Sequence, residues 1–197
     1  HIGLANSQFL SPLNASSLVG LEVLRQVNQN CLASDSPAVA SGSDAATVIL
    51  ARDVVNTINR VRGQETLFDP GLARQTGFNP LTYALGTAAA NRGDEVQAQL
   101  VMGDFGSEVL FVQDAVSMTG GYSLLVSNTV SGQAAAYVAS DEPLIGEELF
   151  ALPALLSENN IHKASLTAQD VLRWLIIILI LAGVLFKIIA RLLVVPV

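Results

Sequence analysis

Residues 96–118, VQAQLVMGDFGSEVLFVQDAVSM, contain the pattern that predicts the fold. The first seven residues form a mostly apolar run of strand length, and the motif GDFG (103–106) follows it directly. In the stretch after this motif, Val109, Val112 and Val116 fall on one face of a helix. A strand, a short glycine turn and a helix in this order are typical of one repeat unit of a parallel sheet.

The same alternation extends to both sides of this unit. Further strands are predicted at residues 1–5, 38–41, 66–68, 122–128 and 134–139, and further helices at 16–32, 44–62, 81–91 and 144–156. We therefore expect an α/β fold: an open, mostly parallel, Rossmann-like sheet of five or six strands with helices on both faces. Ser16 or Ser17, Asp44, and Asp104 or Ser107 are the predicted N-caps of three of the helices.

The charged residues are distributed unevenly along the 197-residue chain. Residues 1–170 hold seven Lys or Arg and seventeen Asp or Glu, a net charge of −10, whereas residues 171–197 hold three basic residues and no acidic one. An acidic domain argues against nucleic acid as a partner, because nucleic-acid binding depends on neutralising phosphates. A basic terminal segment suits lipid headgroups.

Residues 174–186, WLIIILILAGVLF, have no charged side chain. Thirteen apolar residues alone also fit a buried core helix. However, the segment is apolar on every face, and Lys187 and Arg191 are spaced so that both can reach one membrane interface. With Arg173 and Trp174 as anchors on the other side, we predict a transmembrane helix and the lipid bilayer as a partner. The predicted division is a soluble domain at 1–156, a polar linker at 157–169, the transmembrane helix at 170–192 and a tail at 193–197.

The basic residues that flank this helix do not determine its orientation, because two precede the apolar run and two follow it. The acidic domain and the basic C-terminal end favour a domain on the non-cytoplasmic side.

Two predicted strand-to-helix turns are the candidate ligand sites. In a parallel sheet both would lie at the carboxyl ends of the strands, where such folds bind ligands. The candidate residues are Gly42, Ser43, Asp44, Gly103, Asp104, Gly106 and Ser107. The second turn does not match a phosphate-binding glycine motif, it has no lysine nearby, and Asp104 and Glu108 would repel a phosphate. A purely structural role is the alternative: the glycines would allow tight turns, and the Ser and Asp residues would cap the helices that follow.

The sequence shows no catalytic motif and predicts no catalytic residue, metal or cofactor. There is no GxSxG motif, and the two histidines are His1 and His162. Cys31 falls on the buried face of its predicted helix, as expected of an unreactive core cysteine. Glu147 and Glu148 are adjacent and therefore point to different faces of a helix.

The stretches VMGDFGSEVLFVQDA (101–115), SDEPLIGEELFALPALL (140–156) and AQDVLRWLIIILILAGVLF (168–186) resemble a family of uncharacterised bacterial membrane proteins, a domain of unknown function. The resemblance implies a Rossmann-like domain between two transmembrane helices, the first preceding His1. It implies no activity, cofactor or catalytic residue.

These observations favour a non-enzymatic, membrane-anchored domain. Its expected role is that of a structural or accessory subunit, assembled with copies of itself or with other membrane-protein subunits. The alternative is a ligand-binding or sensory domain with a small-molecule or anion site at the carboxyl edge of the sheet. A degenerate enzyme or hydrolase is a third possibility.

Overall fold

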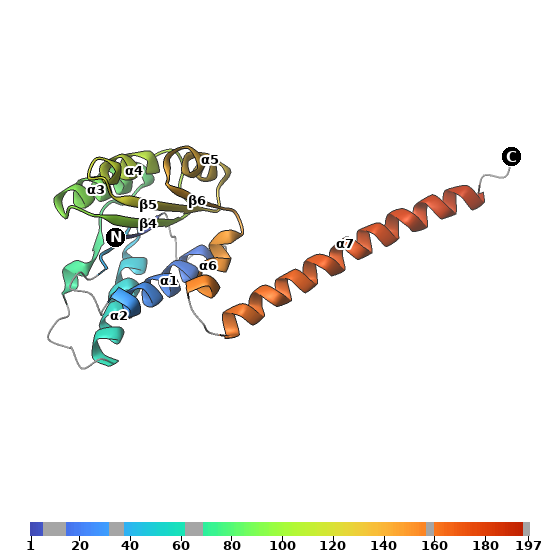
Figure 1. Ribbon diagram of the computed structural model, residues 1–197, viewed down its shortest axis with the longest axis horizontal. Coiled ribbons are helices and arrows are strands. Elements are labelled where there is room, and N and C mark those ends of the chain that lie inside the picture. Colours follow the sequence, from blue (N-terminus) through green and yellow to red (C-terminus); the bar gives the residue numbers. More distant parts are fainter. Residues whose placement is uncertain (6–14, 32–37, 62–68, 157–159, 195–197) are drawn as a thin grey trace. The chain divides into compact units, whose positions relative to one another are not determined.

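The computed structural model describes residues 1–5, 15–31, 38–61, 69–156 and 160–194. The chain divides into two compact units, His1–Leu156 and Ser157–Val197 (Figure 1).

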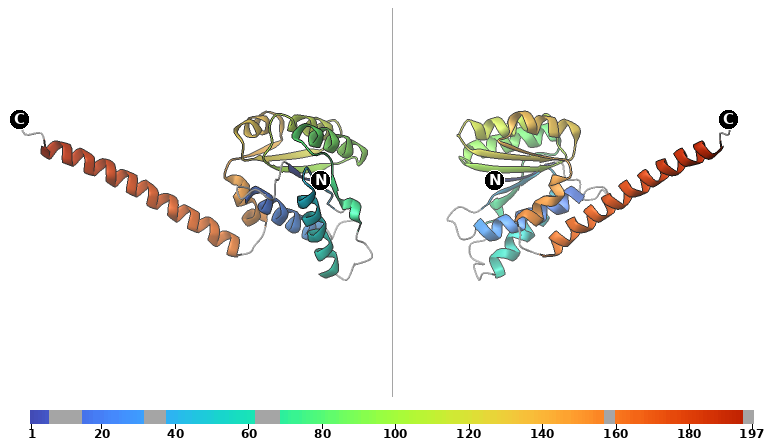
Figure 2. Two further views of the ribbon diagram at one scale, coloured as in Figure 1. Left: turned by 180° about the vertical axis from the view of Figure 1, so that it is seen from behind. Right: turned by 45° about the vertical axis from the view of Figure 1, so that its right-hand side comes forward.

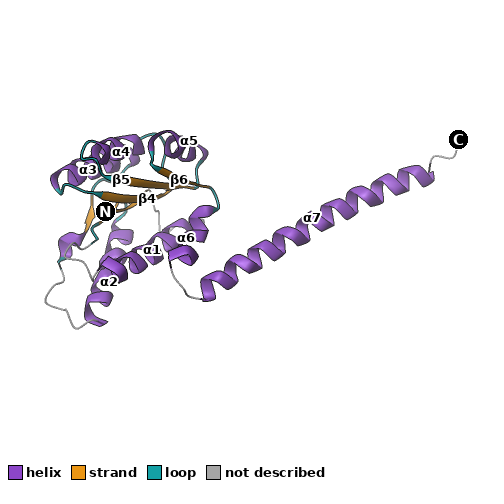
Figure 3. Cartoon of the chain, in the orientation of Figure 1, coloured by secondary structure: helices purple, strands orange, loops and turns teal. Residues whose placement is uncertain are grey.

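The described part of the first unit contains six strands, which form one parallel sheet (Figure 3). The strands are β1 (Ile2–Ala5), β2 (Ala40–Gly42), β3 (Ala73–Gln75), β4 (Ala98–Gly103), β5 (Tyr122–Ser127) and β6 (Glu142–Ile145). The helices are α1 (Ala15–Cys31), α2 (Ala45–Val61), α3 (Pro80–Gly93), α4 (Val109–Ser117), α5 (Val130–Ala139) and α6 (Glu148–Leu156), with a 3₁₀ turn, η2 (Pro70–Leu72), before β3. The strand order, β3-β2-β1-β4-β5-β6, is that of the Rossmann fold. The predicted α/β class is therefore confirmed.

Helices cover both faces of the sheet (Figure 2). The helices α1, α2 and α6 pack on one face, and α3, α4 and α5 pack on the other. Because successive strand residues point to opposite faces, β4 supplies Met102 to the first layer and Val101 to the second. Both side chains are almost completely buried, so the sheet separates two hydrophobic cores.

The strand predicted at residues 134–139 is wrong, because this segment belongs to the helix α5. Thr129 caps the helix by accepting a hydrogen bond from the backbone N–H of Gly132, at 3.1 Å. Alanine has the highest helix propensity of all residues, and three alanines follow this cap. Ala135 and Ala136 are buried in the core between α5 and the sheet.

The predicted start of the next helix at residue 144 is also wrong, because residues 142–145 form the strand β6. Pro143 is compatible with this strand because β6 lies at the edge of the sheet, where β5 is its one neighbour among the described strands. The strand predicted at 66–68 lies outside the described residues. The third strand that the structure shows, β3, falls in a stretch where the sequence predicts irregular structure.

The caps of α1 and α2 differ in outcome. Asp44 precedes α2 and accepts a hydrogen bond from the N–H of Thr47 at 3.2 Å, which confirms it as the N-cap. Ser16 and Ser17 lie inside α1, which begins at Ala15, so neither is its cap.

The second unit contains the helix α7 (Asn160–Val194), which has 35 residues. Its window Leu166–Ile189 has a mean hydropathy of 2.5, and none of this window is buried by other described residues. A core helix of a soluble protein would be mostly buried. The helix is long and apolar enough to cross a membrane. Residues 160–169, predicted as part of a polar linker, are the first turns of this helix.

Candidate functional site

The two predicted ligand-site turns lie at the same edge of the sheet. The central strand β1 separates them, because Leu4 pairs with Gly42 on one side and Ala5 pairs with Gly103 on the other. Two strand spacings place the glycine turns about 10 Å apart. The predicted juxtaposition at the carboxyl edge is therefore present.

The turn after β2 is fixed by hydrogen bonds within the fold. The Gly42 carbonyl accepts from the N–H of Thr76 at 3.2 Å, and the Ser43 carbonyl accepts from the Gln75 amide at 3.0 Å. The Asp44 carboxylate accepts from the backbone of Thr47, as described above. Gly42, Ser43 and Asp44 therefore hold β3 and α2 in place through these hydrogen bonds.

The turn after β4 differs from its prediction. Gly103 has a φ of 126°, a conformation that glycine adopts readily. Neither Asp104 nor Ser107 caps α4, because the residue at the cap position is Glu108, which makes no side-chain cap bond. Instead, the Glu108 carboxylate accepts a hydrogen bond from the N–H of Gly106 at 2.7 Å. The carboxylate therefore points back toward the turn and supplies a hydrogen-bond acceptor for a backbone N–H of that turn.

Asp104 is the one candidate in these turns with a buried polar atom that lacks a partner among the described residues. Its Oδ1 atom is inaccessible and has no hydrogen-bond partner there. Burial raises the pKa of the Asp104 carboxyl above its ordinary value of 3.8. A carboxyl group in this state can donate or accept a proton or bind a hydroxyl group at the carboxyl edge.

Hydrogen bonds also link the turn after β4 to the residues between β5 and α5. The Thr129 hydroxyl donates to the Phe105 carbonyl, and it lies 3.2 Å from the Ser127 hydroxyl. A Cβ atom at Gly132 would overlap both the Phe105 carbonyl and the Ser127 hydroxyl. The absence of a side chain at Gly132 therefore allows α5 to approach this turn closely.

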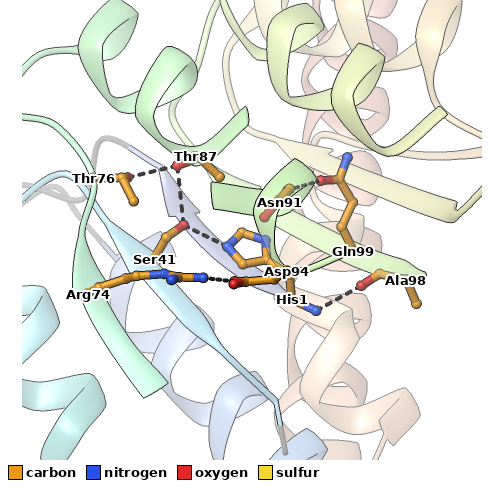
Figure 4. A network of polar contacts seen from close by, with 9 residues as sticks. All are labelled: His1, Ser41, Arg74, Thr76, Thr87, Asn91, Asp94, Ala98 and Gln99. Carbon is orange, nitrogen blue, oxygen red and sulfur yellow. Dashed lines mark hydrogen bonds and ion pairs between the residues drawn. The ribbon is translucent and has the colours of Figure 1, made fainter. Parts of the chain in front are cut away.

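A histidine–serine contact that the sequence did not predict lies inside the domain. Figure 4 shows the His1 ring directed at Ser41, with His1 Nε2 and Ser41 Oγ 3.0 Å apart. Ser41 also contacts the hydroxyls of Tyr83, at 3.3 Å, and of Thr87, at 3.4 Å. Thr87 in turn lies 2.8 Å from Thr76.

This contact does not have the arrangement of a nucleophile and its base. Ser41 is only 1% exposed, so a substrate cannot reach its hydroxyl. His1 Nδ1 has no partner in the described chain, whereas a catalytic histidine is oriented through this nitrogen. Burial raises the pKa of Tyr83 to about 12, so its hydroxyl stays neutral. The group is a polar network that joins His1, just before β1, to β2 and α3.

A second polar network lies between the sheet and the helices α3 and α4. The Asn91 amide donates to Gln99 at 3.0 Å, and the Gln99 amide donates to Gln113 at 3.1 Å. Ser123 donates to the same Gln113 oxygen. These buried amides join α3, β4, α4 and β5 by hydrogen bonds without placing a charge in the interior.

The described residues contain no group of three His, Cys, Asp or Glu that could hold a metal ion. Cys31 is partly buried at the end of α1 and packs against the hydrophobic core. Glu147 and Glu148 are both exposed, and Glu148 accepts from the N–H of Ile145 at 2.9 Å.

The predicted anchor residues all belong to α7. Arg173 and Asp170 form an ion pair at 3.8 Å within the helix. Trp174 and Lys187 are on the same helix, as is the backbone of Arg191.

The model of the family described as Domain of unknown function (DUF6754) matches residues 11–196. The chain belongs to this family. The DUF6754 match spans both the sheet domain and α7, so the family combines the two units. The predicted resemblance to an uncharacterised family is confirmed. No curated protein and no solved structure matches the chain.

Proposed function

We propose that this DUF6754 chain is a non-enzymatic subunit of a membrane assembly in a bacterial membrane, with its α/β domain anchored by α7. The observation that carries the proposal is the unburied apolar window of α7, Leu166–Ile189, which follows a Rossmann-like domain in the chain. Its 24 residues correspond to about 36 Å of helix, which exceeds the thickness of about 30 Å of a bilayer's hydrocarbon core.

The charges near this window support the proposed anchoring. The ion pair between Asp170 and Arg173 reduces the cost of placing either residue near the interface. Lys187 lies close to the other end of the window, where a long basic side chain can reach the headgroups. The domain is proposed to lie on the non-cytoplasmic side, and the lipid bilayer is a proposed partner.

The role of a structural or accessory subunit is proposed because the candidate turns are occupied by contacts that hold the fold. Asp44 caps a helix, Glu108 binds the backbone of its own turn, and Ser41 is buried. Copies of this chain or other membrane-protein subunits are the proposed partners.

Two measurements on the full chain test the proposal. Membranes that contain the chain are first washed at alkaline pH, and we expect the chain to stay in the pellet as an integral protein. The chain is then solubilised in mild detergent, and native mass spectrometry is expected to show more than one polypeptide per particle. Release by the wash, or a strict monomer with no co-purifying partner, would contradict the proposal.

Asp104 favours a second candidate function, a ligand-binding or sensory domain. Its Oδ1 atom has no partner among the described residues, and burial raises the pKa of its carboxyl group. The residue follows β4 at the edge where Rossmann-like sheets bind ligands. A ligand that binds the folded state raises the temperature of unfolding. Thermal unfolding of the full chain with a panel of nucleotides and small anions tests this function, and the absence of any shift at saturating concentrations would remove it.

A further inference from the structure

The outer surface of α3, α4 and α5 is unusually poor in charge. The three helices contain two charged residues, Arg92 and Asp114, and these pair with each other at 3.0 Å. On the opposite layer, α1, α2 and α6 contain six charged residues, namely Glu22, Arg25, Arg52, Asp53, Arg60 and Glu148. We call the exposed residues of α3, α4 and α5 the neutral face.

Most side chains of the neutral face are apolar. Sixteen residues are exposed, seven on α3, four on α4 and five on α5. Eleven of these are Gly, Ala, Pro, Val, Leu, Phe or Tyr: Pro80, Leu81, Leu85, Ala89, Gly93, Leu110, Phe111, Val130, Ala134, Tyr137 and Val138. Phe78 and Met118, which are exposed at the ends of α3 and α4, extend the same surface.

The three helices that carry these side chains are neighbours. The helices α3 and α4 pack side by side, and α5 packs against α4 (Figure 1). Leu81 of α3 lines an open groove of about 700 Å³ together with Leu110 and Phe111 of α4. Glu108 borders the same groove, and its carboxylate is hydrogen-bonded to the N–H of Gly106. At the other end of the same two helices, Arg92 contacts both Asp114 and the sulfur of Met118. Exposed apolar side chains on three neighbouring helices are the kind of surface that serves protein–protein contact.

We propose that the neutral face binds the neutral face of a second copy of this chain. The first unit holds six basic and fifteen acidic residues, a net charge of −9. Two such domains repel each other wherever their acidic surfaces meet. On the neutral face the charges of Arg92 and Asp114 cancel, so two copies meet there with less like-charge repulsion than on the rest of the domain.

The composition of the neutral face also favours a second copy of the chain over a lipid surface as its partner. Membrane-surface helices carry several Lys or Arg residues for the lipid phosphates. This face has Arg92 alone, and its guanidinium already binds Asp114. Aromatic residues and Met are instead enriched, and charged residues depleted, at the centres of protein interfaces. The contact is expected to be isologous, because dimers of this kind most often have two-fold symmetry.

The proposal rests on the proposed function in one respect. Anchoring of α7 in a membrane would confine the copies to one plane and raise their effective concentration. A dimer could then form through an interface of modest affinity.

Substitutions on the two layers test the contact in the full chain. Phe111→Glu or Leu85→Glu places a charge on the neutral face, and each is expected to weaken dimerisation about thirtyfold or more. Ile49→Glu is the matched control, because Ile49 is an exposed aliphatic residue of α2 on the opposite layer. Mass is measured in mild detergent over a range of protein concentrations, and circular dichroism verifies that each variant is folded.

Cross-linking in vesicles provides a second readout. In a Cys31→Ala background, Phe111→Cys is expected to give a dimer with a short bis-maleimide, and Ile49→Cys is not. A dimer that Phe111→Glu and Leu85→Glu leave intact would overturn the proposal. Equal cross-linking at both positions, or a particle of one chain with a different protein on this face, would overturn it as well.

The two proposals fail in different ways. A chain that resists the alkaline wash but remains a monomer overturns the contact and leaves membrane anchoring intact. A chain that the wash releases, but that still cross-links through Cys at position 111, overturns the proposed anchoring and supports the contact.

Discussion

Among the candidate site residues, Asp104 has the least favourable surroundings in the folded protein. Its carboxyl group is partly buried, and one oxygen has no partner among the described residues. Burial disfavours the ionised form, so this side chain opposes folding when it loses its proton. Residues with a shifted pKa are common at binding sites, where a side chain is kept for binding although it lowers stability. Asp104 fits this description.

The first prediction concerns the pH dependence that Asp104 causes. Because the pKa of this carboxyl is raised above 3.8, the folded protein keeps a proton that the unfolded chain loses. The free energy of unfolding therefore falls as the pH rises from 3.8 through the raised pKa. Asp104→Asn stays neutral and is expected to raise the midpoint of thermal unfolding by about 1–2 °C at pH 7, with no gain at pH 3.

The exposed Asp53→Asn is the control, since it removes one negative charge from the surface of α2. A lower midpoint for Asp104→Asn at pH 7 would show that the ionised carboxylate has a stabilising partner in the folded protein.

The second prediction concerns the close approach at Gly132. Gly132→Ala introduces a Cβ atom that overlaps the Ser127 hydroxyl and the Phe105 carbonyl. The backbone of α5 must shift away from the turn after β4, and we expect a loss of about 1–3 kcal/mol in the free energy of unfolding, measured in urea. Gly93→Ala is the control, because its Cβ atom would meet nothing within 4 Å. Equal stabilities would indicate that α5 is not held against this turn.

At the scale of elements, the sequence predicts a helix or strand best where side-chain periodicity and burial agree. In α2, the residues spaced along one predicted face, Val48, Ala51, Val55 and Ile58, are all buried. The stretch at 134–139 misled because its alanines have no periodicity that separates a helix from a buried strand, and the cap at Thr129 decides the outcome. At β6, proline and acidic residues resemble a helix start, but the position at the sheet edge accommodates them.

The candidate turns were predictable because parallel strands bring their carboxyl ends to one edge. The contact between His1 and Ser41 was not predictable, since the two residues lie 40 positions apart and no local pattern links them. The same holds for the pairing of Arg92 with Asp114, which depends on α3 and α4 being neighbours.

The third prediction tests whether Asp44 acts through its hydrogen bond or through its charge. Asp44→Ala removes the acceptor for the N–H of Thr47 and is expected to cost about 1 kcal/mol of the free energy of unfolding. Asp44→Asn keeps an acceptor at the same place and should retain most of that stability. Urea unfolding of both variants gives the comparison. An Asn variant as unstable as the Ala variant would show that the negative charge itself is required.

At the scale of the whole molecule, the two units differ in what they require from their surroundings. The first unit has two hydrophobic cores of its own, whereas α7 has an apolar window with none of it buried. The domain should therefore fold without the helix, while the helix needs an apolar environment.

The fourth prediction follows from this difference. A chain that ends at Leu156 is expected to appear in the soluble fraction of the cell and to unfold cooperatively. Its far-UV circular dichroism should match that of a folded α/β domain. The full chain, expressed in parallel, is the control and should sediment with the membranes. A shortened chain that is unfolded, or that still sediments with the membranes, would show that the domain depends on α7 or binds the membrane by itself.

The central position of β1 also affects how the protein forms during synthesis. This strand lies early in the sequence, yet its partner on one side, β4, begins at Ala98, and Ala5 pairs with Gly103, 98 positions later. At a synthesis rate of about 5–20 residues per second, β1 waits about 5–20 seconds for that neighbour. Long-range parallel pairing is slow in itself. The nascent chain thus keeps one apolar strand edge open for seconds, and we expect chaperones that shield such edges to increase the yield of folded protein.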